Sequence, residues 1–187
     1  MPQFEPSKIR NVAVVGHRGT GKTSLVEAML FQAGATNRLG SIEASSTVSD
    51  WDEDEHKRQM SLAASLCHLE WQGRKINLID APGDPGFQAD ALAALRVVEG
   101  ALVVVNGVAG VEVQTTRVWE RAEQLGLCRV VFVNMLDRER ADFFAALRTP
   151  EPAFEPLHRR PDPDRSRARA PRHRRSLPHA CVHVARR

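Results

Sequence analysis

Apolar and polar positions follow two alternating spacings along the first 149 residues. Short valine-rich runs bounded by glycine or polar residues, such as 9–15, predict buried strands. Between them, apolar residues recur every three or four positions, as Leu25, Met29 and Leu30 do, and this spacing predicts helices. Strands are predicted at 9–15, 61–71, 75–79, 101–105 and 129–133, and helices at 22–33, 87–98, 113–125 and 141–147.

Strands that alternate with helices of about a dozen residues predict an α/β fold, with a mostly parallel, doubly wound sheet and helices on both of its faces. Ligands of such sheets bind at the carboxyl ends of the strands. Residues 36–59 do not follow the alternation, because they have little apolar periodicity and many acids. A long mobile loop is predicted there.

The pattern stops after Pro150. Residues 150–187 hold ten Arg, no Lys and four Asp or Glu, a net charge of +6, so residues 1–149 carry −3 of the total of +3. Repeated Pro and Arg with few large apolar residues cannot form a packed core. We therefore predict a folded domain at 1–148 and an Arg/Pro-rich tail at 149–187 that is disordered or the product of a frameshift.

Composition limits the compartment. No run of 18 apolar residues exists, which argues against a membrane span, and the N-terminus lacks the apolar core of a signal peptide. The three cysteines are far apart and form no CxxC pair, which favours a reducing compartment over a disulfide framework or a zinc site. A cytoplasmic protein without membrane contact is the expectation.

The segment GHRGTGKT, between a predicted strand and a predicted helix, matches the phosphate-loop pattern. Its glycines let backbone N–H groups turn toward phosphate oxygens, and the helix N-terminus adds its dipole. Lys22 would reach the β- and γ-phosphates, and Thr23 would ligate Mg²⁺; a purely structural Gly-rich turn is the disfavoured alternative. The predicted phosphate-binding residues are Gly16, His17, Arg18, Gly19, Thr20, Gly21, Lys22, Thr23 and Ser24.

Two further strand ends carry candidate chemistry. Asp80, Ala81, Pro82 and Gly83 follow the strand at 75–79. Asp80 would hold Mg²⁺ through water, and the Gly83 N–H would meet a γ-phosphate. This segment alone is more often a plain turn, but beside a phosphate loop it predicts a phosphate-loop NTPase fold.

Asn134 and Asp137 close the strand at 129–133. Two polar side chains three positions apart at a strand end can recognise a base edge, and a carboxylate that accepts two N–H bonds favours guanine. An Asn-initiated turn with an exposed Asp is the alternative.

These segments, in this order, resemble the GTPase domain of translational GTPases, in particular bacterial elongation factor G and its paralogues. The likeness covers residues 8–148 and rests on GHRGTGKT, DWDEDEHKRQMSL, DAPGDPGF, GVEVQTTRVWERAEQLG and VNMLDRERADFF. It implies a partial GTP-binding domain at 1–148 that binds GTP or GDP with Mg²⁺ and hydrolyses GTP during work on the ribosome, as a monomer. It places Ser61 where the family's first switch has a Mg²⁺-binding Thr, and Asn134 and Asp137 in the guanine-reading motif.

The chain departs from the family in three places. Met135 replaces the Lys that covers the base, so it can stack but cannot donate a hydrogen bond. Asp84 replaces the His that orients the attacking water, which makes Lys22 and Asp84 the catalytic candidates. The final strand, the Ser-Ala guanine loop and the last helix have no counterpart, so the predicted fold is incomplete at its C-terminal end.

Asp84 would face a triphosphate that is already negative. Two unit charges about 5 Å apart at an effective dielectric near 20 repel by roughly 3 kcal/mol. We therefore expect Asp84 to turn outward or the second switch to stay open, and turnover to be slow. A nonenzymatic GTP-binding module on the ribosome and an inactive fragment remain alternatives, while Asn134 and Asp137 argue against an ATPase.

The composition of the tail bears on its origin. Its Arg content could attract RNA, but Phe154 is its one aromatic residue, so it offers no stacking platform. Arg, Pro, Ala and His are what GC-rich DNA encodes out of frame, and this favours a frameshift over a solvated linker or RNA contact. We predict that another reading frame beyond codon 148 encodes strand and helix patterns with a Ser-Ala loop. Stop codons or unpatterned sequence in both other frames would contradict this.

Overall fold

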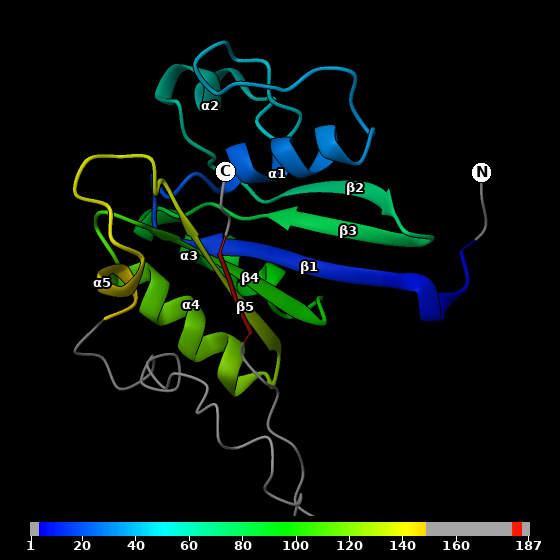
Figure 1. Ribbon diagram of the computed structural model, residues 1–187. Coiled ribbons are helices and arrows are strands. Elements are labelled where there is room, and N and C mark those ends of the chain that lie inside the picture. Colours follow the sequence, from blue (N-terminus) through cyan, green and yellow to red (C-terminus); the bar gives the residue numbers. More distant parts are fainter. Residues whose placement is uncertain (1–3, 149–180, 185–187) are drawn as a thin grey trace, which may run out of the picture.

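The computed structural model describes residues 4–148 and 181–184. In these residues six strands form one sheet in the order β2-β3-β1-β4-β5-β6 (Figure 1). All neighbouring pairs are parallel except β2 and β3, which form an antiparallel hairpin. The strands are β1 Ile9–Gly16, β2 Ser65–Trp71, β3 Arg74–Asp80, β4 Gly100–Asn106, β5 Cys128–Asn134 and β6 Cys181–Val184.

Helices cover both faces of the sheet. Helix α1 lies over β1, β2 and β3 on one face, and α3, α4 and α5 lie on the other (Figure 1). None of the helices in the described parts of the chain is long and apolar enough to cross a membrane. The helices are α1 Lys22–Gln32, α2 Glu53–Arg58, α3 Gln88–Ala94, α4 Val113–Gln124 and α5 Phe143–Leu147, with 3-10 turns η1 Pro6–Lys8 and η2 Pro85–Phe87.

The central strands are apolar on both sides because each side is covered. Val14 of β1 and Val104 of β4 face α1, whereas their neighbours in sequence face α3 and α4. Val103, Val104 and Val105 are all fully buried. This explains the unbroken valine runs of the sequence, and it confirms the predicted α/β fold with a mostly parallel sheet.

The segment predicted as a long loop contains a helix. Helix α2 begins after Asp52, whose side chain accepts from the Asp54 N–H, and Glu55 completes a capping box by reaching back to the Asp52 N–H. Such reciprocal caps stabilise a helix without apolar periodicity. The strand predicted from residue 61 also begins later, at Ser65.

The sheet has one strand that the sequence pattern did not predict. Cys181–Val184 pairs in parallel with β5, from Val130 beside Cys181 to Val133 beside Val184. Four residues are too few for a period-2 signal, so the Arg/Pro composition of their surroundings dominated the prediction. Residues 149–180 and 185–187 lie outside the described residues, so the predicted nature of the tail stays a prediction.

Among the described residues, Trp119 of α4 is the largest fully buried side chain, and the Arg129 guanidinium lies 4.2 Å from its ring centre. We expect Trp119→Ala to lower the free energy of unfolding by about 3–5 kcal/mol, because it leaves a cavity in the core. Trp71→Ala is the matched control, since Trp71 is 45% exposed at the end of β2. Its expected cost is below about 1 kcal/mol. Urea unfolding followed by far-UV circular dichroism measures both; equal losses would contradict the assigned core.

Candidate functional site

Three segments meet at the carboxyl ends of β1, β3 and β5. The loop 17–21 follows β1 and leads into α1, whose first residue is Lys22. Gly21 needs glycine for two reasons: its φ of 83° is left-handed, and a Cβ there would collide with Asn134 Nδ2. A side chain at position 21 would therefore displace the Asn134 amide, which connects the loop to the end of β5.

The Lys22 side chain is buried inside this loop. Its Nζ donates a hydrogen bond to the His17 carbonyl at 2.9 Å, and the residue is only 7% exposed. Burial lowers the pKa of Lys22 to about 8, although the carboxylates of Asp80 and Asp50 oppose this shift. A buried ammonium group at the bottom of a backbone loop is suited to bind an anion.

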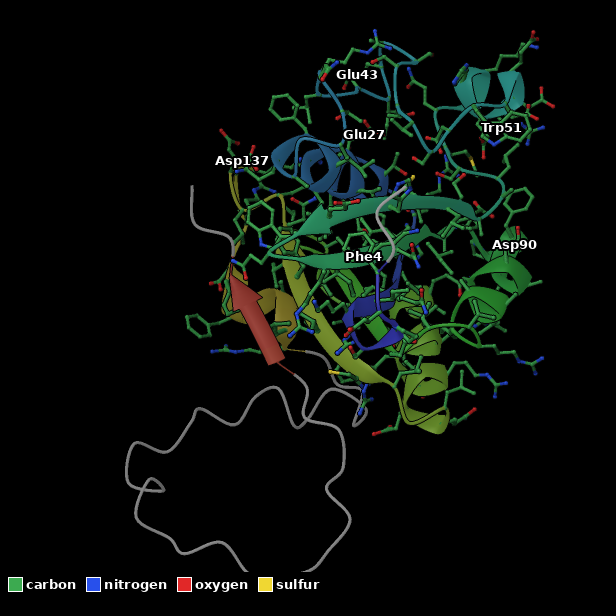
Figure 2. All side chains as sticks on the ribbon, turned by 90° about the vertical axis from the view of Figure 1, so that its right-hand side faces the viewer. Phe4, Glu27, Glu43, Trp51, Asp90 and Asp137 are labelled. Atoms are coloured by element: carbon green, nitrogen blue, oxygen red, sulfur yellow. The ribbon has the colours of Figure 1, made fainter. Side chains whose placement is uncertain are left out.

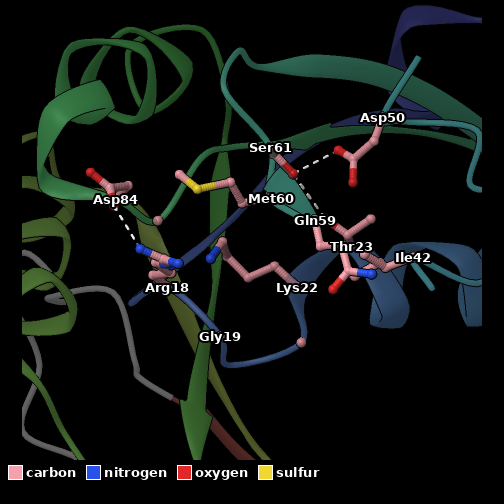
Figure 3. A pocket seen from close by; sticks show the side chains of 12 residues that line it. Arg18, Gly19, Lys22, Thr23, Ile42, Asp50, Gln59, Met60, Ser61 and Asp84 are labelled. Carbon is pink, nitrogen blue, oxygen red and sulfur yellow. Dashed lines mark hydrogen bonds and ion pairs between the residues drawn. The ribbon is translucent and has the colours of Figure 1, made fainter. Parts of the chain in front are cut away.

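A hydroxyl and carboxylate cluster lies beside Lys22 (Figure 3). Thr23 Oγ1 donates to Asp80 Oδ2 at 2.7 Å and lies 3.2 Å from Ser61 Oγ. Ser61 Oγ in turn donates to Asp50 Oδ1 at 2.7 Å. Burial raises the pKa of Asp80 to about 6 and raises the pKa of Asp50 as well.

This cluster fits a magnesium ion. Two hydroxyls and two carboxylates are hard oxygen donors of the kind that Mg²⁺ prefers. Asp80 Oδ1 is buried and makes no hydrogen bond of good geometry with the described residues, although the nearby Ser49 hydroxyl lowers the pKa of Asp80. A buried carboxylate is costly to leave without a compensating charge, and a cation bound at this point would supply that charge. Thr23, Ser61 and Asp80 were predicted for this role; Asp50 was not.

Gly83 lies directly against the phosphate loop. A Cβ on Gly83 would lie 2.7 Å from both the Arg18 backbone nitrogen and the His17 carbonyl carbon. These are backbone atoms that cannot turn aside, so the position is restricted to glycine. The segment after β3 can thus approach the loop as closely as a direct backbone contact with a bound phosphate requires.

Asp84 lies at the edge of the pocket beside Arg18 of the phosphate loop. Its Oδ2 lies 3.5 Å from Arg18 Nη1, and its Oδ1 accepts from the Gly86 N–H at 2.9 Å. Asp84 lines the same pocket as Lys22 and Thr23. The expectation that Asp84 turns outward, or that the second switch stays open, concerns a bound triphosphate and stays a prediction; it did not include the positive charge of Arg18.

The predicted base-reading segment lies on the other side of the loop. Asn134 Nδ2 donates to the Thr20 carbonyl at 2.9 Å and so connects β5 to the phosphate loop. Met135 adopts a left-handed φ of 60° and lies close to Gly21. Asp137 is exposed and does not line the pocket (Figure 2).

Some predicted residues line the pocket and others support it. The pocket is lined by Arg18, Gly19, Gly21, Lys22, Thr23, Ile42, Asp50, Gln59, Met60, Ser61, Gly83 and Asp84. The predicted residues outside this lining are Gly16, His17, Thr20, Ser24, Asp80, Ala81, Pro82, Asn134, Met135 and Asp137. Among these, Asp80 reaches the pocket through Thr23, and His17 Nε2 lies 3.4 Å from Glu112 Oε1.

Two buried glutamates hold the segment that supplies Asp50 and Ser61. Glu55 accepts from the N–H groups of Trp51, Asp52, Leu62 and Ala63 at 3.2, 3.3, 2.9 and 3.3 Å. Glu27 of α1 accepts from the Val48 N–H at 2.5 Å and lies between α1 and the overlying loop (Figure 2). Sequence reasoning missed both, although the spacing of Asp52 and Glu55 is that of a capping box.

The strand order of the sheet and the geometry of the loop define a phosphate-loop nucleotide-binding domain. A family model described as the elongation factor Tu GTP binding domain matches residues 7–159, and the chain belongs to that family. The description names GTP as the ligand of the domain.

Curated relatives agree with this family. Elongation factor G of Chlamydia caviae is 38% identical over 145 residues, which are 78% of this chain and 21% of that protein. The mitochondrial ribosome-releasing factor 2 of Drosophila ananassae is 42% identical over 137 residues, 73% of this chain and 18% of that protein. The chain therefore spans about a fifth of the length of the relatives it matches. These matches confirm the resemblance to translational GTPases.

A solved structure also agrees. A protein of Thermus thermophilus, known from its crystal structure, is 40% identical with a TM-score of 0.72, over 75% of this chain and 21% of that one. An identity and a TM-score this high mean that the matched parts of the two chains share their fold.

Glu55 offers a test of how the site is held. We expect Glu55→Ala to destabilise residues 51–63 locally by about 1–3 kcal/mol, because it leaves four N–H groups without their acceptor. The measurement is hydrogen–deuterium exchange of this segment. Glu53→Ala is the control, since the Glu53 side chain is 89% exposed and pairs with Lys57 on the same helix. Exchange that is as slow in Glu55→Ala as in the control would contradict the role given to Glu55.

Proposed function

We propose that this domain binds GTP and GDP together with Mg²⁺, and that it hydrolyses GTP during work on the ribosome. One observation carries the proposal: the Thr23 hydroxyl contacts both Asp80 and Ser61, which brings the phosphate loop, the end of β3 and the segment before β2 to one point. These are the groups that a phosphate-bound magnesium ion requires.

Different residues of the site would bind different parts of the nucleotide. Lys22 and the N–H groups of the loop would hold the phosphates, and the Gly83 N–H would contact the terminal one. Thr23 and Ser61 would ligate Mg²⁺, and Asp80 and Asp50 would hold it through water. Mg²⁺ bound there supplies positive charge that offsets the charge of the phosphates.

Guanine recognition falls to the segment after β5. Asn134 fixes the segment against Thr20, Asp137 would accept from the N1–H and N2–H₂ groups of guanine, and Met135 would stack on the base. Since Asp137 is exposed, it would have to approach the base when the nucleotide binds.

The ribosome is the proposed partner, and the cytoplasm the proposed compartment. The names of the relatives, elongation factor G and ribosome-releasing factor 2, support a role in translation. A cytoplasmic protein is also consistent with cysteines that form no CxxC pair.

A second candidate is GTP binding with little turnover, and Asp84 favours it. In the resembled family a His at this position orients the attacking water. Asp84 instead accepts from Gly86 and pairs with Arg18, so both carboxylate oxygens already have partners. Ribosome-stimulated GTP hydrolysis, measured in single turnover, separates the two candidates.

Lys22 tests the proposal directly. We expect Lys22→Ala to weaken GDP and GTP binding at least tenfold, because it removes charge-assisted hydrogen bonds worth about 1.5–3 kcal/mol to the phosphates. Lys57→Ala is the control: it removes the same charge from an exposed position on α2. Titration with fluorescent GDP and a nonhydrolysable GTP analogue provides the affinities. An unchanged affinity in Lys22→Ala would place the nucleotide elsewhere.

A further inference from the structure

Two opposite charges meet at the edge of the pocket from different segments. Arg18 belongs to the phosphate loop and Asp84 follows Gly83, and their Nη1 and Oδ2 atoms lie 3.5 Å apart (Figure 3). Both residues line the pocket beside Lys22 and Thr23. With a nucleotide bound as proposed above, the pair would lie beside its terminal phosphate.

Asp84 is fixed in this place. Its Oδ1 accepts from the Gly86 N–H at 2.9 Å, and its carbonyl accepts from the Phe87 N–H at 3.1 Å, so both side chain and backbone belong to the turn η2. Gly83, the preceding residue, packs against the backbone of the phosphate loop. The carboxylate cannot move far from the pocket without disrupting this turn.

Arg18 is the adaptable partner. Its side chain is 59% exposed, against 25% for that of Asp84, and only its long aliphatic stem connects it to the loop. The ion pair itself contributes little to stability, since exposed pairs rarely do. The pair matters locally, because the positive charge of Arg18 offsets the negative charge of Asp84.

This charge matters most when a third phosphate is present. A γ-phosphate beside the Gly83 N–H would face the Asp84 carboxylate, and two like charges a few ångströms apart repel strongly. A diphosphate has no group at that position. We propose that Arg18 is a specificity-determining residue that neutralises Asp84 and thereby allows the pocket to accept a triphosphate as readily as a diphosphate.

The inference rests on the proposed function, that the pocket binds guanosine nucleotides, and a double-mutant cycle tests it. The chains are the unchanged protein, Arg18→Ala, Asp84→Asn and the double variant, each titrated with GDP and with a nonhydrolysable GTP analogue. We expect Arg18→Ala to lower the affinity for the analogue on the order of tenfold and the affinity for GDP less than about twofold. Asp84→Asn in the Arg18→Ala background should restore most of the affinity for the analogue, because it removes the uncompensated charge.

Control variants distinguish the effect of losing the Arg18 charge from the effect of disturbing the structure. Arg10→Ala removes the same charge from an exposed position at the start of β1, away from the pocket, and should leave both affinities unchanged. Arg18→Lys keeps the charge and should keep most of the affinity for the analogue. If Arg18→Ala does not fold, Arg18→Gln replaces it in the cycle.

The outcomes distinguish the inference from the function beneath it. If the unchanged protein binds neither nucleotide, the proposed function fails and the inference with it. A second outcome is that the unchanged protein binds both nucleotides while Arg18→Ala lowers the two affinities equally, or while Asp84→Asn fails to restore the affinity for the analogue. In either case the inference is overturned and the proposed function stands.

Discussion

The hydrogen bond from the Thr23 hydroxyl to Asp80 is the contact on which the site depends. Thr23 is the second residue of α1 and Asp80 the last of β3, so this bond fixes the start of the helix to the end of the strand. The adjacent Ser61 hydroxyl adds the segment before β2. One side chain thus connects three segments that are distant in sequence, and the pocket forms around it.

This arrangement requires charges that the fold alone would not place in the interior. Lys22, Asp50 and Asp80 are all nearly inaccessible to solvent. Burial moves the pKa of Lys22 down and those of both Asp residues up, so each group is held against the preference of its surroundings. Sites that bind charged ligands commonly contain such groups, because the ligand supplies the charge that the protein lacks.

The sequence predicted the parts of the fold that have many apolar neighbours. The valine runs of β1 and β4 and the amphipathic α4 were visible because burial on a covered sheet produces long, regular patterns. Helix α2 was not predicted, since it depends on polar caps between Asp52 and Glu55. The four residues of β6 were too short to be seen.

The residues of the candidate site also fall into two groups, those that the sequence predicted and those that it did not. Lys22, Thr23, Asp80 and Asn134 lie within local motifs, so their positions followed from a few neighbouring letters. Asp50 acts through a hydrogen bond to Ser61, and Glu55 through hydrogen bonds to the backbone at 62 and 63. The capping-box spacing of Asp52 and Glu55 indicates a helix start but does not reveal these more distant partners.

Asp84 shows why a single substitution cannot be interpreted alone. Taken by itself, an acid beside a phosphate site indicates repulsion, an open loop and a weakened ligand. In the structure the same residue caps η2 by accepting a hydrogen bond from the Gly86 N–H, and it pairs with Arg18. Its negative charge therefore already interacts with two donors. The glycine before it permits close packing against the loop, and this proximity places the carboxylate beside Arg18. An acid at position 84 and a base at position 18 are therefore best understood as one feature of this pocket: the charge that the first introduces is the charge that the second offsets.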